Sequence, residues 1–109
     1  MAVGTLTVDE AISIVVERIV PLFSPEKIIL FGSQARGDAK PDSDLDFLIV
    51  LAKCEDRKAA TIAMMRTVAD LPIGTDIVVT TPQQLETRGR LKSTVLYSAM
   101  KDGRTVYAR

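Results

Sequence analysis

Two aspartates, Asp44 and Asp46, lie two residues apart at the start of an apolar run that ends at Leu51. If this run is a β-strand, side chains two apart point to the same face, and the two carboxylates sit side by side, roughly 5–7 Å apart by the rise of a strand. Two close anions repel each other, and one takes up a proton unless a cation lies between them. Magnesium is a hard divalent ion that prefers carboxylate and phosphate oxygens. The pair therefore predicts a magnesium site.

A third aspartate, Asp76, begins another short apolar run that ends at Thr80. In a sheet, Asp76 could lie beside the edge that carries Asp44 and Asp46. Three carboxylates on one sheet edge would form a two-metal site for in-line phosphoryl chemistry. We therefore expect these three aspartates to act together.

Gly32 and Ser33 directly follow the apolar run at residues 27–31. Glycine lets a phosphate approach the backbone, the following turn can aim N–H groups at it, and the serine hydroxyl is a further donor. Arg36 could contact phosphate as well, although an exposed ion pair with an aspartate of the same loop is an equally good interpretation. The sequence thus predicts a phosphate cradle beside the metal ligands.

The elements that would position these residues follow from the spacing of the apolar side chains. We expect helices over residues 8–20, 56–71 and 94–101, a short helix capped by Thr81, and strands over 27–31, 44–51, 76–80 and 104–108. Thr7 and Glu10 form a capping box for the first helix, and Pro21 and Pro25 are expected to end it. This order of helices and strands predicts an α/β (or α+β) fold, with a small sheet flanked by helices.

Length, charge and composition narrow the class of protein. The 109 residues fit one domain, residues 1–109. A formal net charge of +0 excludes a global basic field for nucleic acid. Histidine is absent, which excludes a Ser-His-Asp triad and leaves carboxylates, Lys, Arg, hydroxyls, the thiol or a metal for catalysis. No membrane-length apolar run, no basic secretory start and a single cysteine, Cys54, predict a soluble, cytoplasmic protein.

The whole pattern resembles a known family. Gly32-Ser33, ten residues, then Asp44-Leu45-Asp46, between two apolar runs, is similar to the signature of the minimal nucleotidyltransferases of the DNA polymerase β superfamily. The resemblance continues through residues 75–79, 93–96 and 103–107 and so covers nearly the whole chain. It implies a polymerase β-like nucleotidyltransferase fold with a small mixed sheet flanked by helices.

The resemblance also implies roles for the candidate residues. Gly32 and Ser33 would bind the triphosphate of a nucleotide, with ATP expected as substrate. Asp44 and Asp46 would bind Mg²⁺, with two ions expected, and Asp76 would complete the metal site and help to activate the incoming hydroxyl. Many members of the family are antitoxins encoded beside a HEPN-domain ribonuclease toxin, and some attach AMP to that toxin.

Each candidate residue also has a plainer interpretation. The Asp44–Asp46 pair alone could be a solvated turn that leads into a strand. Gly32-Ser33 could be an ordinary turn at the end of a strand, and Asp76 a polar residue after a turn. The combination of all these features, in this order, favours the catalytic interpretation.

Three functions are consistent with this reading. The resemblance implies transfer of AMP to a hydroxyl of a partner protein, a HEPN-type toxin. An intact carboxylate set, in a chain too short for an acceptor-binding domain of its own, is consistent with a partner protein that brings the acceptor hydroxyl. The alternative is a non-catalytic antitoxin, a binding module that neutralises its partner by covering it. Nucleotidylation of a small molecule, such as an aminoglycoside, is less favoured because those enzymes generally carry an additional substrate domain.

Overall fold

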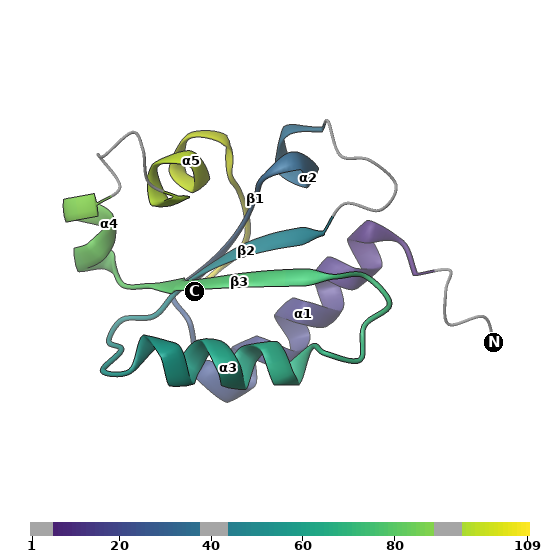
Figure 1. The fold of residues 1–109 in the computed structure, drawn as a ribbon, viewed down its shortest axis with the longest axis horizontal. Helices are drawn as coiled ribbons and strands as arrows, with labels where there is room; N and C mark the ends of the chain where they lie inside the picture. The colour runs from purple at the N-terminus through teal and green to yellow at the C-terminus, as the bar shows by residue number, and fades with distance from the viewer. Residues whose placement is uncertain (1–5, 38–43, 89–94) are drawn as a thin grey trace.

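The fold is a four-stranded sheet with helices on both faces (Figure 1). The computed structural model describes residues 6–37, 44–88 and 95–109. Along the chain the elements are α1 (Val8–Phe23), β1 (Lys27–Phe31), α2 (Ser33–Arg36), β2 (Leu45–Val50), α3 (Arg57–Thr67), β3 (Thr75–Thr80), α4 (Pro82–Arg88), α5 (Val95–Asp102) and β4 (Arg104–Ala108). The strand order is β3-β2-β1-β4. β2 pairs with β3 in parallel, and β1 pairs with β2 and β4 antiparallel, so the predicted mixed sheet is confirmed.

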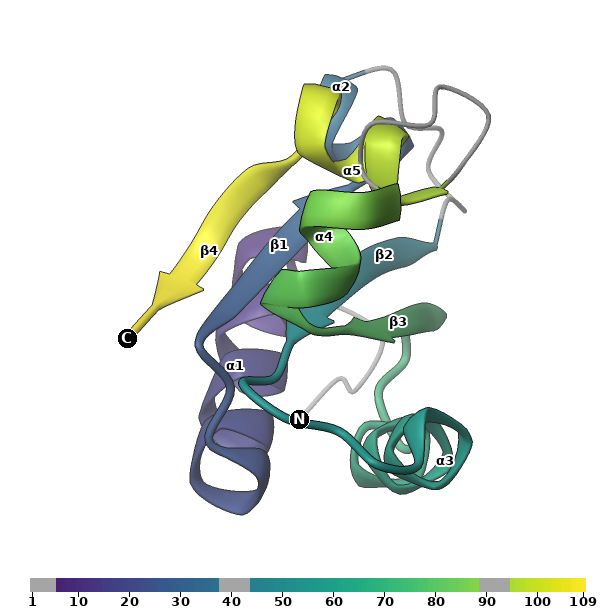
Figure 2. The same ribbon diagram turned by 90° about the vertical axis from the view of Figure 1, so that its left-hand side faces the viewer.

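Alternate residues of the central strands face two different helical layers. Leu45, Phe47 and Ile49 of β2 belong to a core that α1 and α3 complete, whereas Leu48 packs with residues of α5 on the other face. Figures 1 and 2 agree with this arrangement, with α1 and α3 on one side of the sheet and α2, α4 and α5 on the other. Because both faces are covered, β1 and β2 are nearly continuous apolar runs. The even-numbered residues of β2, which include Asp46, therefore share the face that carries α2 and α5.

α1 begins as predicted and ends three residues later than predicted. The capping box is present: Thr7 Oγ1 accepts from the Glu10 N–H at 3.1 Å, and Glu10 Oε1 accepts from the Thr7 N–H at 3.1 Å. Pro21 does not end the helix but lies inside its last turn. A proline in the last turn removes one N–H donor without interrupting a long ladder. The helix ends at Phe23, and the next residue, Ser24, adopts a left-handed conformation. Ser24 precedes Pro25, and proline disfavours helical geometry at the position before it.

α3 begins as predicted and ends earlier than predicted. Asp56 caps it by accepting from the Ala59 N–H at 3.0 Å. The helix stops at Thr67 instead of continuing to residue 71. Arg18 of α1 stabilises this end, because its Nη1 donates to the Thr67 carbonyl oxygen at 3.1 Å and satisfies an acceptor of the last turn. The following residues tighten into turns before Pro72.

The C-terminal elements follow the prediction closely. The Thr81 hydroxyl caps α4 by accepting from the Gln84 N–H at 3.3 Å. The expected start of α5, Thr94, lies outside the described residues, and its end at Asp102 is one residue beyond the predicted one. Among the described residues, no helix is both long and apolar enough to cross a lipid bilayer.

Candidate active site at one end of the sheet

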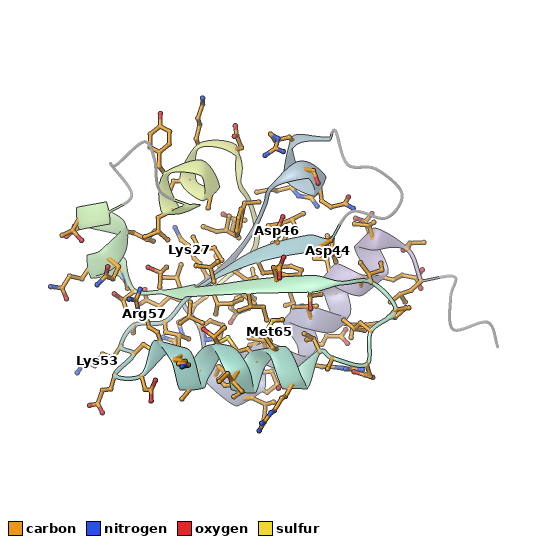
Figure 3. The ribbon with its side chains drawn as sticks, in the orientation of Figure 1. Lys27, Asp44, Asp46, Lys53, Arg57 and Met65 are labelled. Carbon is orange, nitrogen blue, oxygen red and sulfur yellow. The ribbon has the colours of Figure 1, made fainter. Side chains whose placement is uncertain are left out.

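The strand register brings the predicted carboxylates to one end of the sheet. Asp46 and Asp76 are direct partners in the parallel ladder of β2 and β3. Paired residues of neighbouring strands point to the same face of a sheet, and so does Asp44, two positions before Asp46. Figure 3 shows Asp44 and Asp46 near the start of β2, on the side of the sheet that carries α2. Three aspartates from two strands therefore share one edge and one face.

The end of β1 lies at the same edge. Phe31, its last residue, is the antiparallel partner of Asp46, so Gly32 follows directly beside the carboxylate. A Cβ atom at Gly32 would overlap Asp46 Oδ2 and lie 3.2 Å from Asp46 Cγ. Gly32 also has a φ of 75°, which side-chain-bearing residues rarely adopt. Both the backbone angle and the neighbouring carboxylate thus require glycine at this position.

A second glycine supports the same edge, and sequence analysis did not assign it a role there. Gly74 immediately precedes β3, and a Cβ atom on it would overlap Asp44 Oδ1 and lie 2.8 Å from Asp44 Cγ. Its carbonyl oxygen accepts from the Leu45 N–H at 2.9 Å, which fixes the start of β3 against β2. The signal in the sequence was a glycine two residues before Asp76, but its meaning depends on the strand register.

The turn that was expected to aim N–H groups at a phosphate is a single helical turn, α2. Its bonds run from the Ala35 and Arg36 N–H groups to the Gly32 carbonyl oxygen, at 3.2 and 3.1 Å. The N–H groups of Ser33 and Gln34 stand at the head of this turn, where no carbonyl of the helix can receive them. Donors at such a position can bind an anion. The remainder of the polar stretch before β2, residues 38–43, lies outside the described residues.

The charges at this edge act most strongly on Asp46. Partial burial raises the pKa of the Asp46 carboxyl above its ordinary value, and the negative charges of Asp76 and Asp44 raise it further. The Arg36 guanidinium acts in the opposite direction. Asp44, Asp76 and Arg36 thus all lie close enough to act on Asp46. Because close carboxylates repel each other, binding of a cation at this edge is favourable.

The donor set fits a hard divalent cation, although the side chains do not yet enclose one. The available ligands are carboxylate oxygens, which magnesium prefers. As the side chains lie, however, the described residues contain no group of three or more Cys, Asp or Glu placed closely enough to hold a metal ion. A cation at this edge would have to draw the three carboxylates closer together.

Comparison with solved structures identifies the same fold in nucleotidyltransferases. A structure assigned as a nucleotidyltransferase from Sulfolobus solfataricus has a TM-score of 0.60 at 22% identity and covers 97% of this chain and 90% of that chain. A toxin–antitoxin structure with AMP-PNP has a TM-score of 0.61 at 23% identity, with 87% and 72% covered. A variant of the toxin–antitoxin MntA–HpeT has a TM-score of 0.62 at 23% identity, with 94% and 74% covered. At these identities the likeness shows a shared fold.

Sequence comparison identifies the family. A search of curated proteins finds no match to the chain. The family model described as "Nucleotidyltransferase domain" matches residues 12–102, which is well over half of the chain and includes every candidate residue at the sheet edge. The chain therefore belongs to the nucleotidyltransferase domain family.

Proposed function

We propose that this chain is a single-domain nucleotidyltransferase that transfers AMP from ATP to a hydroxyl group of a partner protein, as the antitoxin of a HEPN-type toxin. The observation that carries the proposal is the pairing of Asp46 with Asp76 in the sheet, directly beside Gly32. Within a nucleotidyltransferase domain, this arrangement brings carboxylates and a phosphate-binding turn to one place.

The similar structures support an antitoxin role and a nucleotide substrate. Two of them are toxin–antitoxin structures, and one of these contains AMP-PNP, an analogue of ATP. A further MntA–HpeT structure, with a TM-score of 0.58 at 18% identity, is a variant in which two aspartates two residues apart are replaced by glutamate. Asp44 and Asp46 have the same spacing in this chain.

In the proposed reaction, residues of this chain bind the triphosphate of the nucleotide at two places. Asp44, Asp46 and Asp76 would hold magnesium, with two ions expected, and the metal supplies charge neutralisation of the triphosphate. The Ser33 hydroxyl and the N–H groups at the head of α2 bind phosphate oxygens and orient the α-phosphate. Binding at these two places also restrains the nucleotide in the geometry that the reaction needs.

The transfer itself is a displacement at the α-phosphorus. The acceptor oxygen forms a bond to that phosphorus while the bond to the bridging oxygen of the β-phosphate breaks, and pyrophosphate leaves. Asp76 takes up the proton of the acceptor hydroxyl, and the donors at the head of α2 stabilise the charge that develops on pyrophosphate.

Mass spectrometry of the partner tests this proposal. The purified protein is incubated with ATP, magnesium and the protein encoded in the adjacent reading frame. We expect the partner to gain the mass of one AMP unit. The double variant Asp44→Asn with Asp46→Asn should give no gain, and the control Glu55→Gln, an exposed carboxylate away from the sheet edge, should behave like the wild type. A partner of unchanged mass with the wild-type protein would contradict the proposal.

A second candidate is a non-catalytic antitoxin that covers its partner. The observation that favours it is the open spacing of the carboxylates, which form no closed group for a metal in the described residues. The same double asparagine variant separates the two functions. If it still neutralises the partner, occlusion is sufficient, and if neutralisation is lost while binding persists, chemistry is required.

A further inference from the structure

An apolar groove lies along the free edge of the sheet, between α3 and the segment that leads into β3. Its volume is about 450 Å³. The apolar side chains that line it are Ile62, Met65, Val68, Ala69, Leu71 and Ile73. Ile62 is 44% exposed, which is high for an isoleucine in a helix that packs on a sheet. Figure 3 shows Met65 between α3 and the sheet, so the groove continues the core outward to the surface.

The groove ends at the carboxylate edge. Gly74 and Thr75 complete its lining, Gly74 abuts the Asp44 carboxylate, and Asp76 is the next residue of the strand. Thr75 and Asp76 point to opposite faces because side chains alternate along a strand. β3 is the outermost strand on this side, so a chain that leaves the groove needs to pass only the start of this strand to reach Asp76. The apolar groove and the candidate active site are thus adjoining surfaces.

The helix beside the groove is basic. Arg57, Lys58 and Arg66 are its charged residues, and all three are exposed. Within the described residues, none of them makes an ion pair, and Arg66 lines the groove itself. The exposed acidic residues of α1 contrast with this, since Asp9, Glu10 and Glu17 line a separate hollow on that helix. A segment that fits the groove would therefore combine apolar side chains with acidic ones.

We propose that this groove binds the acceptor protein. The occupant is an amphipathic segment of that partner, with apolar side chains in the groove and carboxylates facing Arg66, the charged residue that lines it. The same segment presents its hydroxyl group beyond Gly74, at the edge formed by Asp44 and Asp76. This inference rests on the proposed transfer to a partner protein, because it names the surface through which the partner is held.

Two substitutions in the groove test it, each with a matched control. Ile62→Arg places a charge in the groove, and Leu22→Arg makes the same change at an exposed apolar residue of α1, which is 66% exposed. Arg66→Glu reverses a charge of the groove, and Lys101→Glu reverses an exposed one on α5. The probe is the protein encoded in the adjacent reading frame. Its Kd is measured by calorimetry and its KM by AMP incorporation, beside the Kd for ATP and the thermal unfolding of each variant.

We expect each groove variant to weaken partner binding about tenfold or more, as truncation of a central interface contact does. The KM for the partner should rise in parallel, while the Kd for ATP and the Tm stay at wild-type values. The two control variants should bind the partner normally. Unchanged partner affinity in both groove variants, or an equal loss in the controls, would overturn the inference.

The outcomes also separate this inference from the proposed function. If the wild type binds the partner without modifying it, and Ile62→Arg weakens that binding, the docking surface stands and the transfer reaction fails. If the partner is modified with an unchanged KM by both groove variants, the reaction stands and the docking surface is wrong. Sedimentation of the protein alone provides a third outcome: a dimer that Ile62→Arg dissociates would assign the groove to a second copy and overturn the inference.

Discussion

Asp46 of β2 and Asp76 of β3 face each other directly across a parallel strand pair. Like charges in neighbouring positions of a sheet destabilise it. Partial burial of the Asp46 carboxyl raises its pKa most, and the charges of Asp76 and Asp44 raise it further. Without a bound cation, repulsion among these carboxylates therefore lowers the stability of the folded protein.

We predict that Asp46→Asn raises stability while it abolishes transfer. Asparagine keeps the shape of the side chain and removes the charge that Asp76 and Asp44 repel. In metal-free buffer at neutral pH, the Tm should rise by a few degrees. AMP transfer should fall at least about a hundredfold, because a group that stabilises charge in the transition state is lost. Glu55→Gln is the control, and a lower Tm for Asp46→Asn would show that the repulsion is unimportant.

The same carboxylate predicts a dependence of stability on pH. The pKa of Asp46 is higher in the folded protein than its ordinary value, so the folded state binds the proton more tightly. The stabilisation from this proton is complete below the ordinary pKa, about 3.9, and is lost as the pH rises through the raised folded value. Denaturant unfolding of the wild type and Asp46→Asn in metal-free buffer should therefore diverge in favour of the variant as the pH rises through this window. Parallel profiles would contradict the assignment.

Magnesium should offset the repulsion among the three aspartates and stabilise the folded protein. If the three aspartates bind the ion, only the folded state offers that site, and a concentration of ten times the Kd stabilises the protein by about 1.4 kcal/mol. The Tm of the wild type should rise with added magnesium chloride, and that of Asp44→Asn with Asp46→Asn should not. Sodium chloride at matched ionic strength controls for screening. Equal increases in Tm for the wild type and the double variant would show that the three aspartates do not bind magnesium.

The positions of the strands that form this edge can be predicted from the sequence, but their order and register in the sheet cannot. β1, β2 and β3 could be located to within one residue because each is an apolar run bounded by glycine, proline or aspartate. The pairing of Asp46 with Asp76 depends on the order and register of the strands, which local spacing does not determine. For the same reason Gly74 could be interpreted only as part of a turn, although it lies against the Asp44 carboxylate, which a Cβ atom at this position would displace.

The helix ends show a similar limit. Pro21 suggested the end of α1, but its effect depends on how many residues follow it in the helix. At the end of α3, the Thr67 carbonyl oxygen accepts from the guanidinium of Arg18, 49 positions earlier in the chain. A contact between residues so far apart in the chain cannot be predicted from the residues that surround either of them.

Arg18 supports a further prediction, because it also joins α1 to the turn after α3. Its guanidinium forms a two-point contact with Asp70, at 2.5 Å to Oδ1 and 3.3 Å to Oδ2. The hydrogen bond from Arg18 lowers the pKa of Asp70. The resulting stability is present above the ordinary pKa of an aspartate and is lost as the pH falls through the lowered folded value.

Asp70→Asn should therefore lower the Tm at neutral pH, and the difference from the wild type should disappear in strong acid. The residue is exposed and lies away from the carboxylate edge, so AMP transfer should stay at the wild-type rate. Thermal unfolding across the acid range measures the effect, with Glu55→Gln as the control. A difference that persists unchanged below the lowered pKa would mean that the contact does not act through the charge of Asp70.

The two glycines that flank α2 separate backbone strain from carboxylate position. Gly32 and Gly37 have φ angles of 75° and 83°, so alanine is strained at either position. A Cβ atom on Gly37 meets nothing within 4 Å, whereas one on Gly32 would overlap the Asp46 carboxylate. We predict that Gly37→Ala costs about 1 kcal/mol of stability and leaves the ATP affinity and the transfer rate of the folded protein unchanged.

Gly32→Ala should cost more, about 2–3 kcal/mol, because it adds displacement of Asp46 to the strain. Transfer should fall about a hundredfold, as expected when a reacting group moves by about 1 Å. Denaturant unfolding gives the two stabilities, and AMP incorporation is measured at a temperature where both variants are folded. Equal activity losses in the two variants would mean that α2 as a whole, and not the contact between Gly32 and Asp46, positions the carboxylate for the reaction.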